Sequence, residues 1–238
     1  MSIWERLSAA TRELSFGGQL SSLLGFEPAR DQPKRYAEAD NEVPFTLGVI
    51  VLSAKMAKAD GTVASYEVKA FKEAFKVSPA EMKQVAPLFN SAKRDAANFE
   101  DDAERLVTIF RGNRKLLEDV LDGLFHIAKA DEEVGRQEER FLSEVAKRFG
   151  FTTSEFDSIK ARHIDSAKRN PYDVLGVKPS ISDEELDRHY RKRLEDDDAE
   201  QLVARGVPKE FAIIAQEKRA ALREAYDTIT RLSRLRSW

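Results

Sequence analysis

The chain of 238 residues contains no cysteine, which excludes disulfide bonds and thiolate chemistry. It has no excess of basic residues either, because 39 lysines and arginines stand against 42 aspartates and glutamates. A nucleic-acid-binding function therefore lacks its electrostatic basis. The longest apolar stretch, residues 43–54, is shorter than the roughly 20 residues that span a bilayer, and no secretory signal follows Met1. These absences predict a soluble, cytoplasmic protein.

Catalytic patterns are absent as well. The sequence has no Gly-x-Ser-x-Gly motif and no glycine-rich phosphate loop. Its three histidines, His126, His163 and His189, have no partner at metal-ligand spacing, and His126 lies in an apolar run that predicts a packing role. We therefore expect a protein that is not an enzyme, with no cofactor apart from the divalent metal considered below.

Helical periodicity is what the sequence does contain. In residues 2–14, Ile3, Trp4 and Leu7 share one helical face, which predicts a short helix packed on its own domain. Contact of that face with a partner or a membrane surface is the alternative. Residues 27–44 hold three prolines among charged residues and predict a linker.

The region 45–163 predicts an all-α bundle with short loops. Three positions have the residue types that begin helices: Ser78 followed by proline and glutamate, Asn113 before a leucine-rich run, and Thr152 with Glu155 three residues later. No segment alternates apolar and polar residues as a strand does. The fold class predicted from this pattern is all-α.

The bundle also contains an internal repeat. Residues 57–60 and 128–131 both read AKAD, and a glutamate follows each aspartate at the same spacing. If the two hairpins face each other, their carboxylates form a candidate divalent-metal site, whose ligands would be Asp60, Glu67, Asp131 and Glu138. The alternative is structural, because each aspartate can stabilise its turn and each glutamate lies in the first turn of a helix. The repeat resembles the TerB-like (tellurite-resistance B) domain over residues 45–165.

The C-terminal part carries the most specific pattern. Residues 170–177 read NPYDVLGV, residues 182–192 read SDEELDRHYRK and residues 225–229 read AYDTI. In this order they resemble the opening, the second helix and the third-helix end of a J-domain. The LVARGVP of residues 202–208 closely resembles the DjlA (DnaJ-like A) family, which joins a TerB-like domain to a C-terminal J-domain. The expected core of this helical hairpin comprises Tyr172, Leu175, Ile181, Leu186, Tyr190, Ala225, Tyr226 and Ile229.

The chain departs from the J-domain pattern at one place. Where the family has His-Pro-Asp, this sequence has Asp198, Ala199 and Glu200. In the family this loop and the basic second helix dock on a DnaK-type chaperone and stimulate its ATP hydrolysis. Without proline the turn is less preorganised, and the acidic run 196–200 would repel an acidic docking surface. The candidate partner-binding residues are Arg188, Arg191, Lys192, Arg193, Asp198, Ala199 and Glu200.

Two functions follow from these observations. The leading hypothesis is a DjlA-like co-chaperone-family protein that binds or regulates a DnaK-type chaperone as an adaptor, its ATPase-stimulating tripeptide having been lost. The alternative is a TerB-like divalent-metal or stress-response binding module with an accessory J-like hairpin. The expected domains are a short helix and linker in 1–44, the TerB-like domain in 45–165 and the J-like module in 170–235. The client protein cannot be derived from the sequence.

Overall fold

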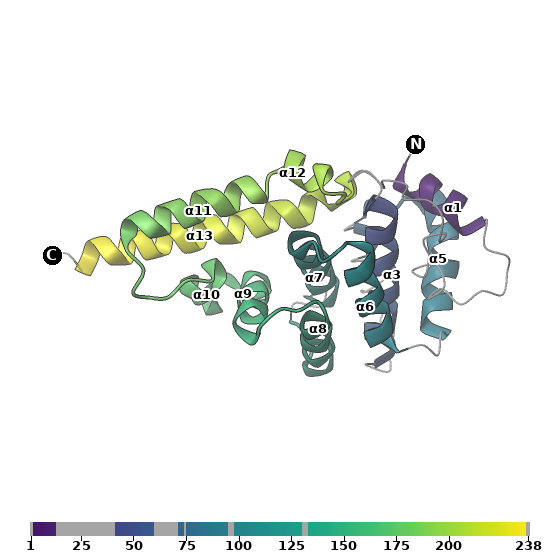
Figure 1. Cartoon of the computed structure of the whole chain (residues 1–238), viewed down its shortest axis with the longest axis horizontal. Coiled ribbons are helices and arrows are strands. Elements are labelled where there is room, and N and C mark those ends of the chain that lie inside the picture. Colours follow the sequence, from purple (N-terminus) through teal and green to yellow (C-terminus); the bar gives the residue numbers. More distant parts are fainter. Residues whose placement is uncertain are drawn as a thin grey trace.

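The computed structural model describes residues 2–12, 41–59, 71–73, 75–94, 98–129 and 133–236. Within these ranges the chain forms helices and no strand, which confirms the predicted all-α class. Figure 1 shows a group of packed helices and a long antiparallel helix pair that extends away from it. The group, here called the bundle, comprises α1 (Ile3–Arg12), α3 (Glu42–Ala59), α5 (Pro79–Arg94), α6 (Phe99–Ile109), α7 (Arg114–Ala128), α8 (Arg136–Arg148) and α9 (Thr153–His163). The C-terminal module comprises α10 (Pro171–Leu175), α11 (Asp183–Asp196), α12 (Ala199–Ala204) and α13 (Ala212–Arg236).

Helix α3 lies at the centre of the bundle. It is apolar on nearly all sides, as a helix surrounded by others must be, and all of its residues from 45 to 57 are buried. A Cβ atom at Gly48 would lie 2.7 Å from a methyl carbon of Leu106, so glycine permits the close packing of α3 against α6. The helix begins at Glu42, inside the predicted linker, because Pro44 falls in its first turn, where proline is tolerated.

Helix α1 packs against the bundle through the face predicted for it. Ile3, Trp4 and Leu7 are all buried in the main core. The Trp4 ring meets Phe71 and Phe75 edge-on, with ring centroids 6.3 Å and 5.7 Å apart. No helix in the described part of the chain is long and apolar enough to cross a membrane.

The predicted helix starts are confirmed by their hydrogen bonds. The Asn113 side chain accepts from the Leu116 N–H at 3.2 Å at the start of α7. Thr152 and Ser182 form capping boxes at the starts of α9 and α11, and Ser78 exchanges the same kind of hydrogen bonds with Glu81 before α5. Local sequence therefore determines where these helices begin.

The free end of the C-terminal module has its own small core. All eight residues expected for it either belong to this cluster or pack against it, and the Tyr190 and Tyr226 rings stack with centroids 4.1 Å apart. Ala161 of α9 also joins the cluster, so the bundle contributes to the module's core. The prediction of a helical hairpin closed by these residues is confirmed.

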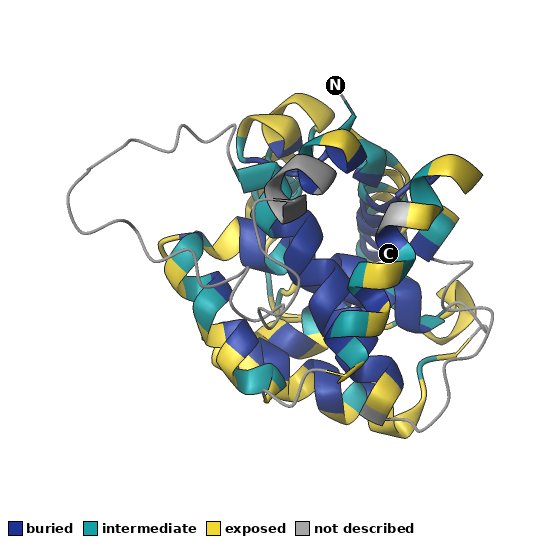
Figure 2. Ribbon diagram, turned by 90° about the vertical axis from the view of Figure 1, so that its right-hand side faces the viewer, coloured by how far each residue is buried: buried dark blue, intermediate teal, exposed yellow. Residues whose placement is uncertain are grey.

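The other end of the module is inserted into the core of the bundle. Leu202, Val207, Phe211 and Ile214 are buried in the main cluster with the bundle helices. The Phe211 ring meets Phe45 and Phe75 edge-on at 4.7 Å and 4.4 Å. Figure 2 shows buried residues along the inward faces of the packed helices. Bundle and module therefore share a hydrophobic core at this junction.

Candidate partner-binding site

The three loop positions aligned with the J-domain tripeptide form the start of α12. The Asp198 side chain is the N-cap and accepts a hydrogen bond from the Glu200 N–H at 3.2 Å. Ala199 and Glu200 are the first two residues of the helix, and both are exposed. The chain therefore presents these positions on the outside of the molecule, on a short helix that begins directly after α11.

Three consecutive aspartates in this loop each have a cationic partner. Asp196 forms an ion pair with Lys115 of α7. Asp197 lies 2.9 Å from the Lys218 Nζ, and Asp198 accepts from the Arg219 guanidinium at 3.0 Å. We call these three ion pairs the aspartate clasp. The acidic run, expected to repel an acidic partner, is largely neutralised by lysine and arginine side chains of the same chain.

One side of the clasp continues into a buried charge network at the junction of bundle and module. The Lys218 side chain is 4% exposed and its Nζ lies within 4 Å of four carboxylates. The distances are 3.6 Å to Glu118, 3.4 Å to Asp119, 3.1 Å to Asp122 and 2.9 Å to Asp197. Three of these acids belong to α7 of the bundle, and the fourth ends α11 of the module.

Three arginines complete the charge balance of this network. Arg162 and Arg193 both donate to one oxygen of Glu118, at 2.8 Å and 3.0 Å, and Arg205 donates to Asp119 at 2.7 Å. Four carboxylates therefore face four cations. A buried group of this kind is tolerated only while every charge keeps its partners.

Two carboxylates of the network, Glu118 and Asp122, remain ionised at neutral pH, whereas burial raises the pKa of Asp119 above its ordinary value despite the nearby Lys218 and Arg205. Burial raises the pKa of Glu118 and of Asp122, but the nearby Lys218 and Arg162 charges outweigh it and hold both pKa values well below the usual range. Burial in turn lowers the pKa of Lys218, and the surrounding carboxylates raise it above its ordinary value. The junction is therefore held by charges rather than by neutral hydrogen bonds.

The basic cluster predicted on α11 is divided among different environments. Arg193 is directed towards Glu118 of the bundle. The Arg191 Nε lies 2.9 Å from Asp187, which also accepts from the Tyr226 hydroxyl at 3.1 Å. Arg188 and Lys192 are exposed, and neither forms an ion pair with another residue of the described ranges. These two residues carry the unneutralised positive charge of the helix.

Comparison with known proteins shows which proteins this chain is similar to. Residues 46–161 match the family model described as "Tellurite resistance protein TerB". The co-chaperone protein DjlA of Photobacterium profundum is 24% identical over 216 residues, which cover 80% of this chain and 78% of that protein. DjlA of Coxiella burnetii is 24% identical over 224 residues, covering 86% and 81%, and DjlA of Vibrio cholerae is 23% identical over 250 residues, covering 92% and 85%.

The chain carries a TerB domain and is a distant homologue of the DjlA co-chaperones. The resemblance stated from the motifs is confirmed at this level, since the DjlA similarity extends from the TerB domain across most of the chain. No solved structure matches the chain.

The candidate metal ligands of the TerB domain are only partly visible. Asp60, Glu67 and Asp131 lie outside the described residues. Glu138 is buried, and its carboxylate accepts from the Gly135 N–H at 2.7 Å, which is a helix-capping contact at the start of α8. In the ranges that the structure describes, no group of three or more His, Cys, Asp or Glu residues is arranged to hold a metal ion.

Several residues of the clasp and network were missed from the sequence: Lys115, Arg205, Lys218 and Arg219. One signal could have found them. Asp119 and Asp122 lie on the apolar face of α7, among leucines and valine, and a carboxylate buried on such a face requires a cation from elsewhere in the fold. The sequence does not say which cation, because the partner of Asp119 in the network lies 99 residues away.

The histidines of the chain have structural partners. The His126 Nδ1 lies 3.1 Å from Glu217, and the His189 Nε2–H donates to the Leu175 carbonyl at 2.8 Å. His163 is buried beside the network, where its Nε2–H donates to Asp122 at 2.8 Å and its ring stacks on Phe125. The predicted packing role of His126 is consistent with its position between the bundle and α13.

His163 makes the stability of the protein depend on pH. Burial lowers the pKa of His163 to about 4, against the opposing pull of Asp122. Since a histidine in the unfolded chain titrates near 6.5, the unfolded state takes up a proton between pH 6.5 and 4 that the folded state does not. The free energy of unfolding should therefore fall as pH decreases through this window, by about 3 kcal/mol at its lower end.

Urea denaturation at pH 7, 6 and 5 measures this decrease. The window lies above the pH at which Glu118 and Asp122, whose pKa values are held low, begin to lose their stabilising effect. A His163→Gln variant keeps an N–H donor for Asp122 and should show a much flatter dependence on pH. An equally steep decrease in this variant would assign the effect to other groups.

Proposed function

We propose that this chain is a DjlA-like co-chaperone-family protein that binds a DnaK-type chaperone as an adaptor or regulator without stimulating its ATPase. The observation that carries the proposal is the outward-facing surface of the C-terminal module. Arg188 and Lys192 on α11 and Ala199 and Glu200 at the start of α12 are exposed, and Asp198 is partly exposed, on a hairpin whose core matches the J-like pattern. The similarity to DjlA co-chaperones over most of the chain supports a chaperone partner.

The proposed loss of stimulation rests on the chemistry of positions 198–200. Asp198 has an anion where the family has an imidazole, and its carboxylate is occupied by the Glu200 N–H and by Arg219. Ala199 does not restrict its backbone as proline does. Glu200 places its carboxylate one methylene further from the backbone. The loop in this chain therefore caps a helix and forms an ion pair within the module.

Steady-state ATP hydrolysis by a DnaK-type chaperone tests this function. We expect the wild-type chain to bind the chaperone, as measured by isothermal titration, without accelerating its ATP turnover. The variant Asp198→His/Ala199→Pro/Glu200→Asp should accelerate turnover several-fold. Proline at position 199 would be the first residue of α12, where its fixed φ and missing N–H are compatible with a helix.

Two outcomes contradict the proposal. Robust stimulation by the wild-type chain would show that the tripeptide is not needed here. If neither the wild-type chain nor the triple variant binds the chaperone, the chaperone is not a partner of this protein. A control is provided by Arg223→Glu on the exposed side of α13, which should leave binding unchanged.

A further inference from the structure

We propose that the groove between α11 and the loop before it binds an extended acidic peptide segment in which acidic and apolar residues alternate. The groove is lined by Val177, Lys178, Ser180 and Ile181 of the loop and by Glu185, Arg188, His189 and Lys192 of α11. It encloses about 550 Å³ and is open along one side. This inference rests on the proposed function in one respect, because Arg188 and Lys192 are shared with the predicted chaperone-binding residues.

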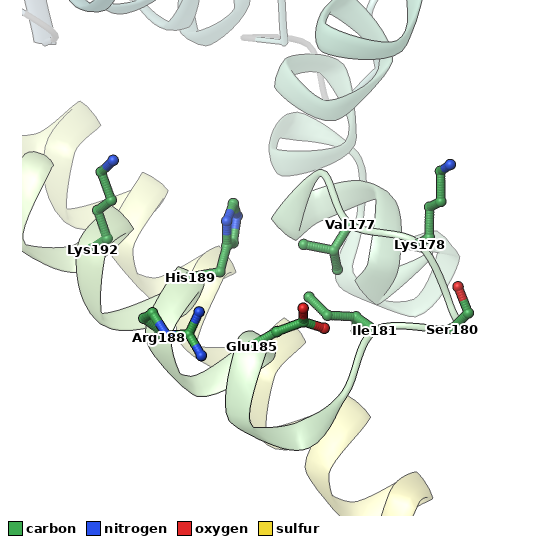
Figure 3. A pocket seen from close by; sticks show the side chains of 8 residues that line it. All are labelled: Val177, Lys178, Ser180, Ile181, Glu185, Arg188, His189 and Lys192. Atoms are coloured by element: carbon green, nitrogen blue, oxygen red, sulfur yellow. The ribbon is translucent and has the colours of Figure 1, made fainter.

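The groove has an uncompensated positive charge. Lys178 extends from the loop wall, and Arg188 and Lys192 come from α11 (Figure 3). None of the three forms an ion pair with another residue in the part of the chain that the structure describes. The single carboxylate, Glu185, is engaged at the start of α11, where it accepts from the Ser182 hydroxyl at 2.8 Å and backbone N–H at 3.3 Å. The pKa of Glu185 is lowered by its hydrogen bonds with Ser182 and by the charge of Arg188, so Glu185 offsets part of the positive charge. Three cations against one carboxylate still leave the groove with an excess of positive charge that attracts anions.

The groove also has an apolar part, which distinguishes a peptide from a free anion. In Figure 3 the Val177 and Ile181 side chains point from the loop towards α11. Both are partly buried and pack against the small core of the module. A free phosphate would contact the basic side chains alone, whereas a peptide with an apolar residue between two acids also covers this surface. The overall net charge of −3 argues against a nucleic acid as the occupant.

The spacing of the basic residues matches an extended backbone. Arg188 and Lys192 are four residues apart on a helix, so their Cα atoms differ by about 6 Å along its axis. Side chains on one side of an extended peptide repeat every two residues, or about 6.6 Å. Acidic residues at positions i and i+2 of the peptide can therefore pair with Arg188 and Lys192. The side chain at i+1 then faces the loop wall, where Val177 lies beside Lys178.

The groove length sets the size of the bound segment. From Glu185 to Lys192 the helix rises by about 10 Å, which three to four extended residues cover. The segment recognised is therefore short. A short segment held mainly by exposed ion pairs binds weakly and dissociates quickly, and its affinity decreases with salt.

Fluorescence anisotropy with a labelled six-residue peptide of alternating glutamate and leucine tests the groove directly, with no chaperone present. We expect saturable binding that weakens as salt is raised from about 50 to 200 mM, since the ion pairs are exposed. The Lys178→Glu/Lys192→Glu variant should bind at least about ten-fold more weakly, because two attractive pairs become repulsive. The matched control Arg223→Glu changes charge by the same amount per site on an exposed part of α13 and should bind normally.

Three results would overturn the proposal. The first is equal binding of a peptide that alternates lysine and leucine, and the second is unchanged binding by the double variant. The third is that a single-stranded oligonucleotide displaces the labelled peptide at a lower concentration than the unlabelled glutamate-leucine peptide does. The thermal unfolding of the variants should match the wild type, because the altered side chains are exposed.

Lys178 separates this inference from the proposed function. It lines the groove but is not among the predicted chaperone-binding residues. Lys178→Glu should therefore weaken peptide binding and leave chaperone binding unchanged. If the chain binds the chaperone and no acidic peptide, the groove proposal alone is wrong. If it binds the peptide and no chaperone, the proposed function alone is wrong.

Discussion

Replacing Lys218 with methionine should lower the free energy of unfolding by about 3–5 kcal/mol. The side chain is 4% exposed, and its charge lies within 4 Å of Glu118, Asp119, Asp122 and Asp197. Methionine fills a similar volume, so the loss is one of charge balance rather than of packing. The remaining three cations of the network would then face four buried carboxylates. Guanidinium-induced unfolding, followed by circular dichroism, measures the change.

A matched control and a second variant identify the cause of this loss. Lys209→Met removes an exposed lysine close to α13 and should change stability by less than about 0.5 kcal/mol. Adding Asp197→Asn to Lys218→Met removes one of the uncompensated carboxylates and should recover part of the loss. A loss below about 1 kcal/mol in Lys218→Met would mean that water or a shifted arginine replaces the lysine, contrary to the enclosed geometry described above.

Replacing Phe211 with alanine should cost about 3–5 kcal/mol, the range for truncating a buried aromatic residue. Although Phe211 belongs to the C-terminal module by sequence, its ring lies between Phe45 and Phe75 of the bundle. A Cβ atom at Gly123 would approach the ring to 2.8 Å, so α7 is also closely packed on it. The cavity left by alanine would therefore open inside the bundle.

Amide hydrogen exchange locates this effect. In Phe211→Ala the amides of α3 and α7 should exchange faster, although the substitution is more than 80 residues from both helices in the sequence. Ile213→Ala, two residues later and 38% exposed, should leave these amides unchanged. Faster exchange confined to α13 would show that the module folds independently of the bundle.

Local patterns in the sequence predicted much of this fold, because helix starts and hairpin cores depend on neighbouring residues. The helix starts at Ser78, Asn113 and Thr152 and the core of the hairpin are examples. What could not be predicted is the insertion of Phe211 into the bundle. An apolar residue after a loop shows that something will be buried, but not which of two adjacent cores will receive it.

The candidate site shows the same limit. Arg188 and Lys192 were expected on an exposed basic surface, and they lie there. Arg193, assigned to the same surface from its place in the sequence, contacts Glu118 of α7, 75 residues earlier. The three aspartates of the clasp were interpreted from their charge alone, whereas their effect depends on Lys115, Lys218 and Arg219. A charge pattern in the sequence gives the sign of each side chain's charge, but it does not identify the residue with which that side chain pairs.

The charge network also has a consequence for the order in which the protein can complete its fold. Glu118, Asp119 and Asp122 are synthesised about a hundred residues before Lys218, and Asp119 is likewise 86 residues ahead of Arg205. While the chain emerges from the ribosome, the carboxylates of α7 cannot yet pair with Arg205 and Lys218, because these cations of the module have not been synthesised. Because burying unpaired charges is costly, the face of α7 that carries them stays hydrated until α13 has been made. The TerB domain therefore reaches its final packing only after nearly the whole chain has been translated.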